Sequence, residues 1–313
     1  MTAHSRITPD LAGSAIRKRV VIGIASAGRP AILAETVRHI ATTLHPPADE
    51  ILVCTPTAED ALHLPELAHL RVVVGQRGLC VQRNALLDAA ETADLIIFFD
   101  DDFFPAADFV ERTLTLFDRR PDVAIATGNV VLDGIHGAGV SFGEARETLA
   151  RTPAQAHSVA DTYNAYGCNM VVRMDLVREH GLRFDERLPL YGWLEDLDFS
   201  RRIAAYGRSV RCTDMVGVHL GVKSGRQPGL RLGYSQIANP WYMLGKRTMS
   251  GSRVTLQIAR HLLANAAGVL RRDATIDRWG RLKGNLRAIG DILLRRCSPE
   301  RILSFDAQRK PAS

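Results

Sequence analysis

Short apolar runs that alternate with helix-like segments constrain the fold of this 313-residue chain more than any other feature. Each run is rich in Val, Ile, Leu or Phe, is shorter than a typical helix, and is followed by turn residues or helical spacing. The expected strands lie at 19–25, 51–53, 71–74, 95–99 and 123–126. Continuous apolar strands that alternate with helices are typical of a mainly parallel sheet covered on both faces. The sequence therefore predicts an α/β fold.

The segments between and after these runs complete the expected order of elements. Helical spacing predicts helices over about 32–40, 79–90 and about 106–119. From Gly128 to about Thr162 the sequence is rich in Gly, Ser and Thr, which predicts long loops near an active site. A strand at 169–172, a helix, a helix ending near Tyr206 and a strand at 208–212 are expected to follow.

Cysteine usage and hydropathy indicate where the protein works. The five cysteines are scattered and show no metal-binding spacing, which fits unpaired thiols in a reducing compartment. The first twenty residues lack an apolar segment, and no apolar run approaches the roughly 20 residues that span a bilayer. We therefore expect a cytoplasmic protein that is at most peripheral on the inner face of the membrane.

The net charge of +6 is distributed unevenly along the chain. Residues 251–313 contain 13 Lys or Arg and 5 Asp or Glu, a net charge of +8, which leaves −2 for residues 1–250. A basic tail behind a nearly neutral body is typical of an attachment element beside a catalytic body. A protein that binds nucleic acid with its whole surface is not indicated.

The basic tail contains two amphipathic segments. Residues 253–270 place one apolar set on a single helix face, and residues 275–296 place a second: Leu256, Ala259, Leu263, Ala266 and Leu270; then Ile276, Trp279, Leu282, Leu286, Ile289 and Leu293. Five basic residues lie outside the second seam: Arg278, Arg281, Lys283, Arg287 and Arg295. Two interpretations remain open. The helices lie on an anionic membrane surface and reach a lipid-linked acceptor, or they pack on the catalytic body or pair in a homodimer.

Three consecutive acids, Asp100, Asp101 and Asp102, directly follow the expected strand at 95–99. In open α/β sheets ligands bind beyond the carboxyl ends of the strands. Adjacent carboxylates repel one another, and a divalent cation relieves that repulsion. Oxygen ligands with open positions suit Mg²⁺ or Mn²⁺ shared with substrate phosphates. The alternative is a helix cap with Pro105 in the first turn, but a cap needs one Asp rather than three. We therefore predict a metal on Asp100 and Asp102.

Two stretches of the sequence resemble family 2 glycosyltransferases. "GLCVQRNALLDAAETADLIIFFDDDFFP" resembles the segment in which an Arg-Asn pair opens a helix and the next strand ends in the D-x-D motif. "YGCNMVVRMDLVREHGLRFDERLPLYGWLEDLDFSRRIAAYG" resembles the acceptor-side segment with its Glu-Asp pair. The resemblance covers about residues 19–220. It implies the glycosyltransferase A fold, a nucleotide-diphosphate sugar donor, inversion at the anomeric carbon and a bacterial polysaccharide type of enzyme.

The resemblance also assigns roles to individual residues. It implies that Asp196 is the base that deprotonates the acceptor hydroxyl, with Glu195 beside it. Acidic residues in the first turn of a helix also interact favourably with the helix dipole, and that alone could explain Asp198. "RVVIGIASAGRP" stands where the first nucleotide-binding strand would be, so its Ser26 and Arg29 are candidate donor contacts, as are Asp100 and Asp101.

Further candidates carry alternative interpretations. Arg83 is a candidate diphosphate or ribose contact, and its neighbour Asn84 is explained as a helix cap. His219 resembles a third metal ligand, but a lone His is also commonly structural. Two basic residues, Lys223 and Arg226, are flanked by Gly221 and Gly225. This pattern indicates either a basic loop that closes over the diphosphate or a solvated loop. Trp193 is either a sugar-stacking residue or a buried aromatic.

Two departures from the family pattern limit what the resemblance implies. The second strand ends in Cys54-Thr55-Pro56 rather than in an Asp, and Glu59 and Asp60 come later, so the donor base is open and a UDP-sugar is the default by family habit. The Q-x-x-R-W motif and the membrane spans of processive synthases are missing, which favours transfer of a single sugar.

We therefore expect a flexible N-terminus (1–17), a glycosyltransferase A catalytic domain (18–225) and a basic amphipathic helical extension (226–313). The predicted reaction moves one sugar, with Mn²⁺ or Mg²⁺, to a hydroxyl of a saccharide or lipid-linked acceptor. One alternative is a sugar nucleotidyltransferase, which normally has a Gly-rich basic loop where this chain has "ASAGRP". Another is an inactive core on a basic protein that binds membrane or nucleic acid.

Overall fold

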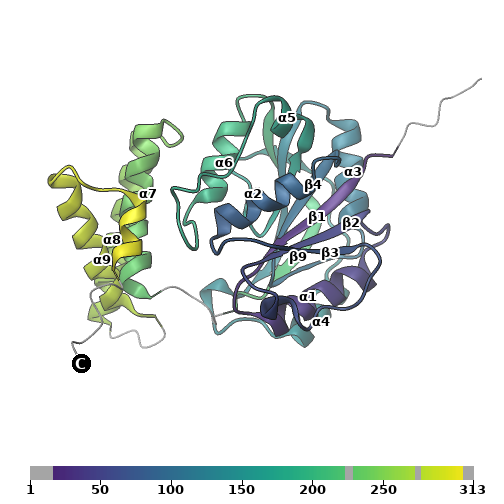
Figure 1. The fold of residues 1–313 in the computed structure, drawn as a ribbon, viewed down its shortest axis with the longest axis horizontal. Coiled ribbons are helices and arrows are strands. Elements are labelled where there is room, and N and C mark those ends of the chain that lie inside the picture. Colours follow the sequence, from purple (N-terminus) through teal and green to yellow (C-terminus); the bar gives the residue numbers. More distant parts are fainter. Residues whose placement is uncertain (1–16, 223–227, 272–275, 306–313) are drawn as a thin grey trace, which may run out of the picture.

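A computed structural model describes residues 17–222, 228–271 and 276–305. These residues form a sheet wrapped by helices and, beside it, a group of helices from the C-terminal part of the chain (Figure 1). The expected α/β class with a mainly parallel sheet and a C-terminal helical part is confirmed. Except for Arg17, the segment expected to be a flexible N-terminus lies outside the described residues.

The sheet places the carboxyl ends of its parallel strands along one edge. On one side the order is β3 (Leu70–Val74), β2 (Glu50–Thr55), β1 (Val20–Ala25) and β4 (Leu95–Asp100), all parallel. Next come β8 (Asn169–Arg173), antiparallel to both neighbours, then β6 (Val123–Asp133) and β9 (Arg208–His219), which are parallel to each other. β5 (Phe103–Pro105) and β7 (Val159–Asp161) pair antiparallel with β9. The acidic triplet after β4 therefore shares an edge with the ends of β6 and β9.

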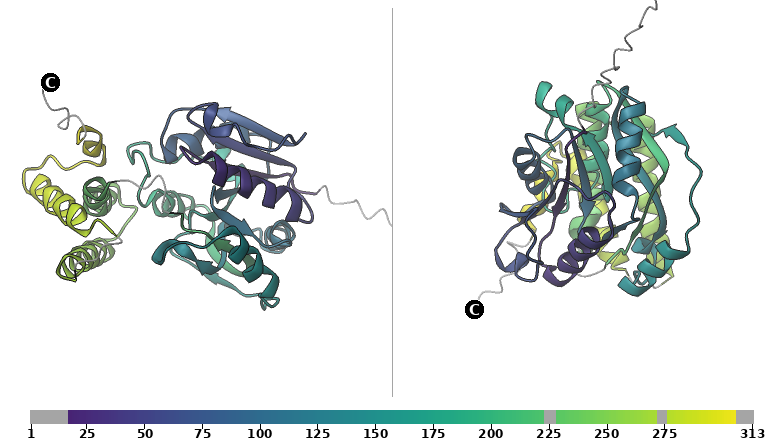
Figure 2. Two further views of the ribbon diagram at one scale, coloured as in Figure 1. Left: turned by 90° about the horizontal axis from the view of Figure 1, so that it is seen from below. Right: turned by 90° about the vertical axis from the view of Figure 1, so that its right-hand side faces the viewer.

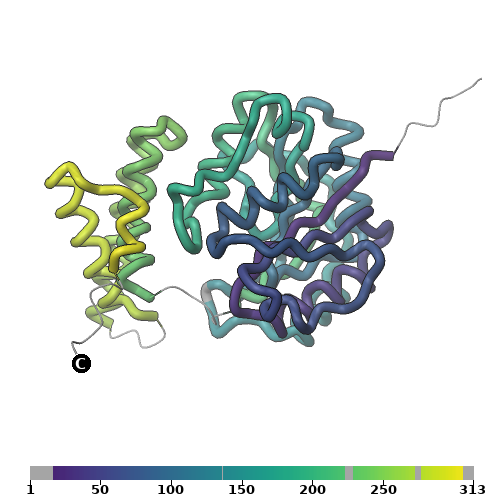
Figure 3. Tube along the Cα trace, viewed as in Figure 1, coloured from purple at the N-terminus to yellow at the C-terminus, as the bar shows by residue number. Residues whose placement is uncertain are grey.

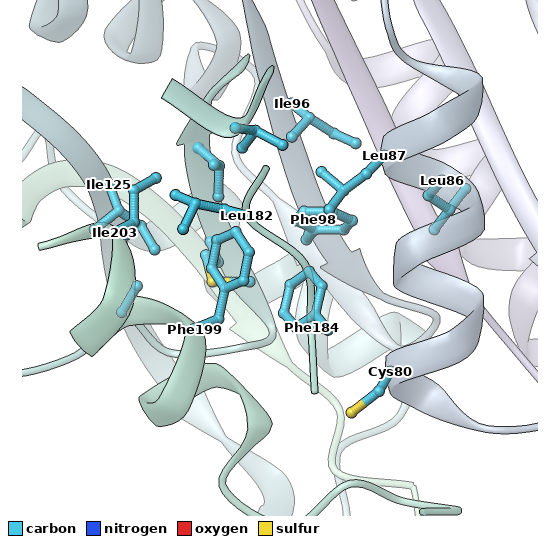
Figure 4. Close-up of a cluster of buried hydrophobic side chains, with 14 of the residues drawn as sticks. Cys80, Leu86, Leu87, Ile96, Phe98, Ile125, Leu182, Phe184, Phe199 and Ile203 are labelled. Carbon is cyan, nitrogen blue, oxygen red and sulfur yellow. The ribbon is translucent and has the colours of Figure 1, made fainter. Parts of the chain in front are cut away.

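Helices cover both faces of the sheet, as continuous apolar strands require. α1 (Pro30–Thr43) and α3 (Phe109–Arg119) pack on one face, and α2 (Leu79–Ala89), α5 (Met174–Glu179) and α6 (Glu195–Ile203) pack on the other. Side chains of β4 alternate between the two cores. Figure 4 shows the core beneath α2 and α6, where the Phe184 ring stacks on Phe199 at 4.3 Å and meets Phe98 edge-on at 5.4 Å. This core supports the edge that carries the acidic triplet from one side.

The region 128–162, expected as long loops, contains regular structure. β6 continues to Asp133, and α4 (Phe142–Arg151) and β7 follow. The strand was predicted to end before Gly128 because glycine is rare inside strands. A Cβ on Gly128 would lie 2.2 Å from the Met215 carbonyl oxygen of β9, at an irregularity in the pairing of β6 with β9. A glycine at such a close approach marks a bulge rather than the end of a strand. β9 likewise runs beyond the expected 208–212.

The triplet is not a helix cap. Pro105 is the last residue of β5, and α3 begins only at Phe109. The alternative interpretation of Asp100–Asp102 as a cap with Pro105 in the first helical turn is therefore wrong.

The C-terminal helices are α7 (Gly229–Lys246), α8 (Gly251–Leu270) and α9 (Arg278–Leu293), followed by the short helix η3 (Pro299–Ser304). α7 lies within the expected helical extension, but the sequence did not define it as a separate helix, because Pro240 and three glycines interrupt its helical signal. Figure 2 shows α7 nearest the sheet domain, with α8 and α9 beyond it. The chain trace shows the same separation of the C-terminal helices from the sheet (Figure 3).

A buried ionic cluster joins α7 to the sheet domain. Lys246 Nζ lies 2.6 Å from Asp198 Oδ2 of α6 and 2.5 Å from Asp185 Oδ2. Tyr242 Oη donates to Asp185 Oδ2 at 2.8 Å, and Thr248 Oγ1 donates to Asp198 Oδ1 at 2.8 Å. Asp198 is therefore a structural residue that connects the two parts of the molecule. Within the described ranges, no helix is both long and apolar enough to cross a bilayer.

Candidate active site

Asp100, Asp102 and His219 meet at the edge where β4 and β9 end. His219 Nε2 lies 3.4 Å from Asp102 Oδ1 and 4.0 Å from Asp100 Oδ2. One ligand atom from each residue lies within 4.8 Å of the other two. Two carboxylate oxygens and one imidazole nitrogen are a donor set that suits Mn²⁺ or Mg²⁺ and leaves positions for phosphate oxygens. The three residues therefore fit the cation that the sequence predicted.

Two residues behind His219 fix the direction of its ring. His219 Nδ1 lies 3.0 Å from Asp133 Oδ1, and Tyr166 Oη donates to Asp133 Oδ2 at 3.1 Å. A carboxylate on the far ring nitrogen is the usual support of a metal-ligating histidine. Burial alone would lower the pKa of His219, but Asp102 and Asp133 outweigh it and raise the pKa to about 10. A cation at Nε2 needs the neutral ring, so metal binding would release a proton.

The Asp101 side chain points away from the Asp100–Asp102–His219 cluster and contacts the β1–α1 turn. Its side chain has no exposed surface, and Ser26 Oγ donates to its Oδ2 at 2.5 Å while Arg29 Nε donates to the same oxygen at 3.1 Å. Thr36 Oγ1 donates to the Asp101 carbonyl at 2.6 Å. Burial raises the pKa of Asp101 to about 7, and Arg29 opposes that shift. Ser26 and Arg29, predicted as donor contacts together with Asp101, thus brace the triplet against the β1–α1 turn.

Asp102 is held by the segment that follows β9. The Val222 amide donates to Asp102 Oδ2 at 2.9 Å, and the Leu220 amide donates to the Asp102 carbonyl at 2.9 Å. Although burial raises the pKa of Asp102, the hydrogen bond and charge of His219 bring it below its usual value. The predicted basic residues Lys223 and Arg226 come directly after this segment and lie outside the described residues.

Arg83 joins the metal side of the site to the Glu-Asp pair. Its Nη1 donates to Glu195 Oε1 at 2.6 Å, and its Nη2 donates to Asp100 Oδ1 at 3.2 Å and to the Gly167 carbonyl at 2.8 Å. The guanidinium is buried between the Phe98 and Phe184 rings, 5.6 and 5.4 Å from their centroids. These contacts give Arg83 a positioning role, and a direct contact with diphosphate or ribose stays a prediction.

Asn84 is not a helix cap. It lies inside α2, where its Nδ2 donates to the Phe184 carbonyl at 3.0 Å and its Oδ1 accepts from the Phe184 amide at 2.8 Å. The Arg-Asn pair therefore anchors the segment that leads into the acceptor-side loop.

Glu195 and Asp196 open α6 after a loop with unusual backbone angles. Leu190 (φ 60°), Gly192 (φ 64°) and Leu194 (φ 72°) are all left-handed. Such conformations cost energy for non-glycine residues and cluster at functional sites. Burial and the charge of Asp196 raise the pKa of Glu195 to about 8, against the effect of Arg83.

Asp196 is held by two backbone amides. Gly167 N donates to Oδ2 at 3.0 Å, and Leu197 N donates to Oδ1 at 2.7 Å. Burial raises the pKa of Asp196, and Arg83 and these amides oppose the increase. A carboxylate with a raised pKa and a fixed direction is suited to accept a proton.

The aromatic loop before α6 lies against the helical extension. The Trp193 ring meets His261 of α8 edge-on at 5.6 Å, and Asn239 of α7 donates to the Trp193 carbonyl at 2.7 Å. Trp193 Nε1 is buried and has no hydrogen-bond partner among the described residues. Tyr191 is half exposed beside it. Stacking of Trp193 on a sugar stays a prediction.

Sequence reasoning missed Asp133, Tyr166 and Gly167. Asp133 had a signal, because it follows three apolar residues just as Asp100 follows β4, but the run was assigned to a loop. Tyr166 and Gly167 carry no such signal, since their importance depends on which strands meet. Asp60, noted only as a departure from the family pattern, accepts a hydrogen bond from Gly28 N at 2.7 Å and so lies at the β1–α1 turn.

Comparison with known proteins identifies the family. No curated protein sequence matches the chain significantly. Among solved structures, S. aureus TarS 1–349 in complex with UDP-GlcNAc is similar, with a TM-score of 0.51 and 14% identity over 91% of this chain and 82% of that one. Mannosyltransferase PcManGT from Pyrobaculum calidifontis, solved with GDP-Man and Mn2+, aligns with a TM-score of 0.49 and 16% identity over 95% of this chain and 77% of that one.

The TarS similarity shows a shared glycosyltransferase A fold. Residues 18–216, more than half of the chain, match the family model described as "Glycosyltransferase like family 2". This range holds the acidic triplet, Arg83 and the Glu195–Asp196 pair. The chain therefore belongs to the family 2-like glycosyltransferases.

Proposed function

We propose that this glycosyltransferase moves one hexosyl residue from a nucleotide-diphosphate sugar to a hydroxyl of a saccharide or lipid-linked acceptor, with inversion and with Mn²⁺ or Mg²⁺. The observation that carries the proposal is the convergence of Asp100, Asp102 and His219 at one strand edge, joined through Arg83 to Glu195, the neighbour of Asp196. UDP is the default nucleotide, by family habit alone.

In the proposed reaction the acceptor oxygen attacks the anomeric carbon as the bond from that carbon to the diphosphate oxygen breaks. Asp196 takes the hydroxyl proton, since each of its two oxygens accepts only one amide hydrogen bond and keeps a lone pair for the proton. Arg83 and Glu195 hold the first turn of α6 in place. A cation on Asp100, Asp102 and His219 would stabilise the charge of the leaving nucleoside diphosphate.

Isothermal titration of UDP and GDP, with Mn²⁺, with Mg²⁺ and with a chelator, tests the proposal. Wild-type protein should bind one nucleoside diphosphate only with metal, and Asp102→Asn should weaken that binding by about a hundredfold. Asp118→Asn, an exposed substitution on α3, is the matched control and should bind like wild type. Equal binding with chelator would contradict the proposal and favour an inactive core. A screen of nucleotide sugars for metal-dependent hydrolysis then identifies the donor.

A further inference from the structure

The helical extension exposes large apolar side chains in a regular pattern. Leu256, Leu263 and Leu270 recur every seven residues along α8, and Trp279, Leu286 and Leu293 do the same along α9. A spacing of seven keeps each set on one helix face. Leu263, Leu270 and Leu293 are 70%, 84% and 78% exposed, and Leu294 after α9 and Leu303 of η3 are exposed as well. These eight residues, the leucine face, are accessible on the described chain.

The residues that the same helices bury completely are mostly small or polar. α8 buries Val254, Asn265 and Gly268, and α9 buries Gly284, Asn285, Ala288 and Asp291. Asn265 Nδ2 donates to Gln236 Oε1 at 2.9 Å and to Asn285 Oδ1 at 2.8 Å, and Asn285 Nδ2 donates to the Gly233 carbonyl at 2.6 Å. Helices that fold against water normally show the reverse arrangement.

This inversion bears on one question left open by the sequence. The exposed leucines of the predicted seam do not pack on the catalytic body, whereas Ile289 of the same seam packs against a core within the extension. The helices hold together through glycine contacts, satisfied amides and a small apolar core around Tyr234, Ile237 and Ala288. The leucine face is therefore left for an apolar medium or an apolar partner.

The charge around the leucine face is almost entirely positive. Within 251–271 and 276–305 six basic residues are exposed: Arg253, Arg260, Arg271, Lys283, Arg295 and Arg296. Within 251–271 and 276–305 the only exposed carboxylate is Asp277, which caps the Gly280 amide at 2.7 Å. Lys283 Nζ lies 5.1 Å over the Trp279 ring, so cation and aromatic share one patch. Leucine, tryptophan and basic side chains together match a surface with an apolar interior and anionic headgroups.

We propose that α8 and α9 dock on an anionic membrane surface, with the leucine face in the boundary between headgroups and acyl chains. A second copy of the chain is the competing occupant. An isologous contact would place the same basic residues opposite one another with hardly any exposed acid to balance them. The membrane supplies the opposite charge, so the observations favour it. The proposal does not rest on the transferase reaction: vesicle binding without sugar transfer would contradict the proposed function alone.

Sedimentation of the full chain with vesicles tests the docking. Wild-type protein should bind vesicles of phosphatidylcholine mixed with phosphatidylglycerol, and bind pure phosphatidylcholine about tenfold less. High salt should weaken the binding, because it screens the basic residues. The double variant Leu263→Ser/Leu286→Ser should lose about tenfold or more in vesicle partitioning.

Leu62→Ser is the matched control. Leu62 is also 70% exposed, but it follows η1 (Glu59–Ala61) in the sheet domain, so this variant should bind vesicles like wild type. Circular dichroism checks that the double variant keeps its helices, and the single variant Leu293→Ser serves in its place if it does not. Light scattering follows the oligomeric state of every protein.

Three outcomes would overturn the proposal. The wild-type chain could fail to sediment with anionic vesicles, or the leucine variants could sediment as well as wild type. The third is a dimer that the double variant splits, seen without any vesicle binding, which would assign the leucine face to a second copy.

Discussion

Asp196 is a half-buried carboxylate whose two oxygens accept amide hydrogen bonds, and its chemistry can be tested by removing the charge alone. Asp196→Asn keeps the shape but cannot take a proton, so the transfer rate should fall by about 10²–10⁴-fold. Metal-dependent nucleotide binding should be unchanged, because the donor side is intact. Steady-state kinetics and titration of the same preparation separate the two effects, with Asp118→Asn as the control.

The raised pKa of Asp196 also leads to a prediction for how kcat/KM changes at acid pH. A base acts only when deprotonated, and burial raises the pKa of Asp196 above the usual value for an aspartate. The wild-type kcat/KM should therefore fall as the pH drops through that raised pKa, earlier than an ordinary aspartate would allow. A kcat/KM that stays constant down to about pH 4 would argue against Asp196 as the base.

Gly167 leaves no room for a side chain between the two halves of the site. A Cβ there would lie 3.2 Å from Glu195 Oε1, 3.3 Å from Arg83 Nη2 and 3.3 Å from Asp196 Cβ. Gly167→Ala should displace the Glu-Asp pair and lower kcat by about tenfold or more. Gly143→Ala, at a position with nothing within 4 Å, should leave kcat unchanged. Equal rates for the two variants would mean that the pair tolerates movement.

At the scale of elements, α7 and α9 cross at two glycines. A Cβ on Gly284 would lie 2.2 Å from the Leu230 carbonyl oxygen, and one on Gly233 would lie 2.0 Å from the Arg281 carbonyl oxygen. Gly284→Ala should force the helices apart and lower the free energy of unfolding by about 1–3 kcal/mol. Gly290→Ala, on the same helix with nothing within 4 Å, should raise it by about 0.5–1 kcal/mol. Urea denaturation distinguishes the two, and shifts of the same sign would contradict the close crossing.

How far the sequence predicts an element depends on whether its signal is local. The strands β1, β2 and β4 and the helices α8 and α9 follow from apolar runs and spacing, and they were expected. The ends of β6 and β9 were missed because Gly128 and Gly217 meet groups on neighbouring strands, which is information that the local sequence lacks. The same reasoning separates Asp102, predictable from its triplet, from Asp133, which matters only because β6 ends beside β9.

For the whole molecule, the predicted division at residue 225 remains a proposal, and Lys246 offers a test of how the two parts are joined. Its ammonium is the cation between Asp185 and Asp198, both largely buried. Lys246→Met removes this ammonium from between the two carboxylates, and the free energy of unfolding should fall by about 3 kcal/mol. Lys283→Met, at an exposed lysine, should change it by less than about 0.5 kcal/mol. If the two variants unfold at the same denaturant midpoint, the cluster adds no net stability.

The position of Arg83 between Asp100 and Glu195 has a consequence for the order in which substrates act. The Arg83 guanidinium interacts with both carboxylates. A cation that arrives at Asp100 with the donor would therefore compete with Arg83 for the Asp100 carboxylate. The Arg83–Glu195 attraction would then strengthen at the expense of Arg83–Asp100, and the first turn of α6 would be held more tightly. We therefore expect donor loading to prepare the acceptor side, so that the donor binds before the acceptor.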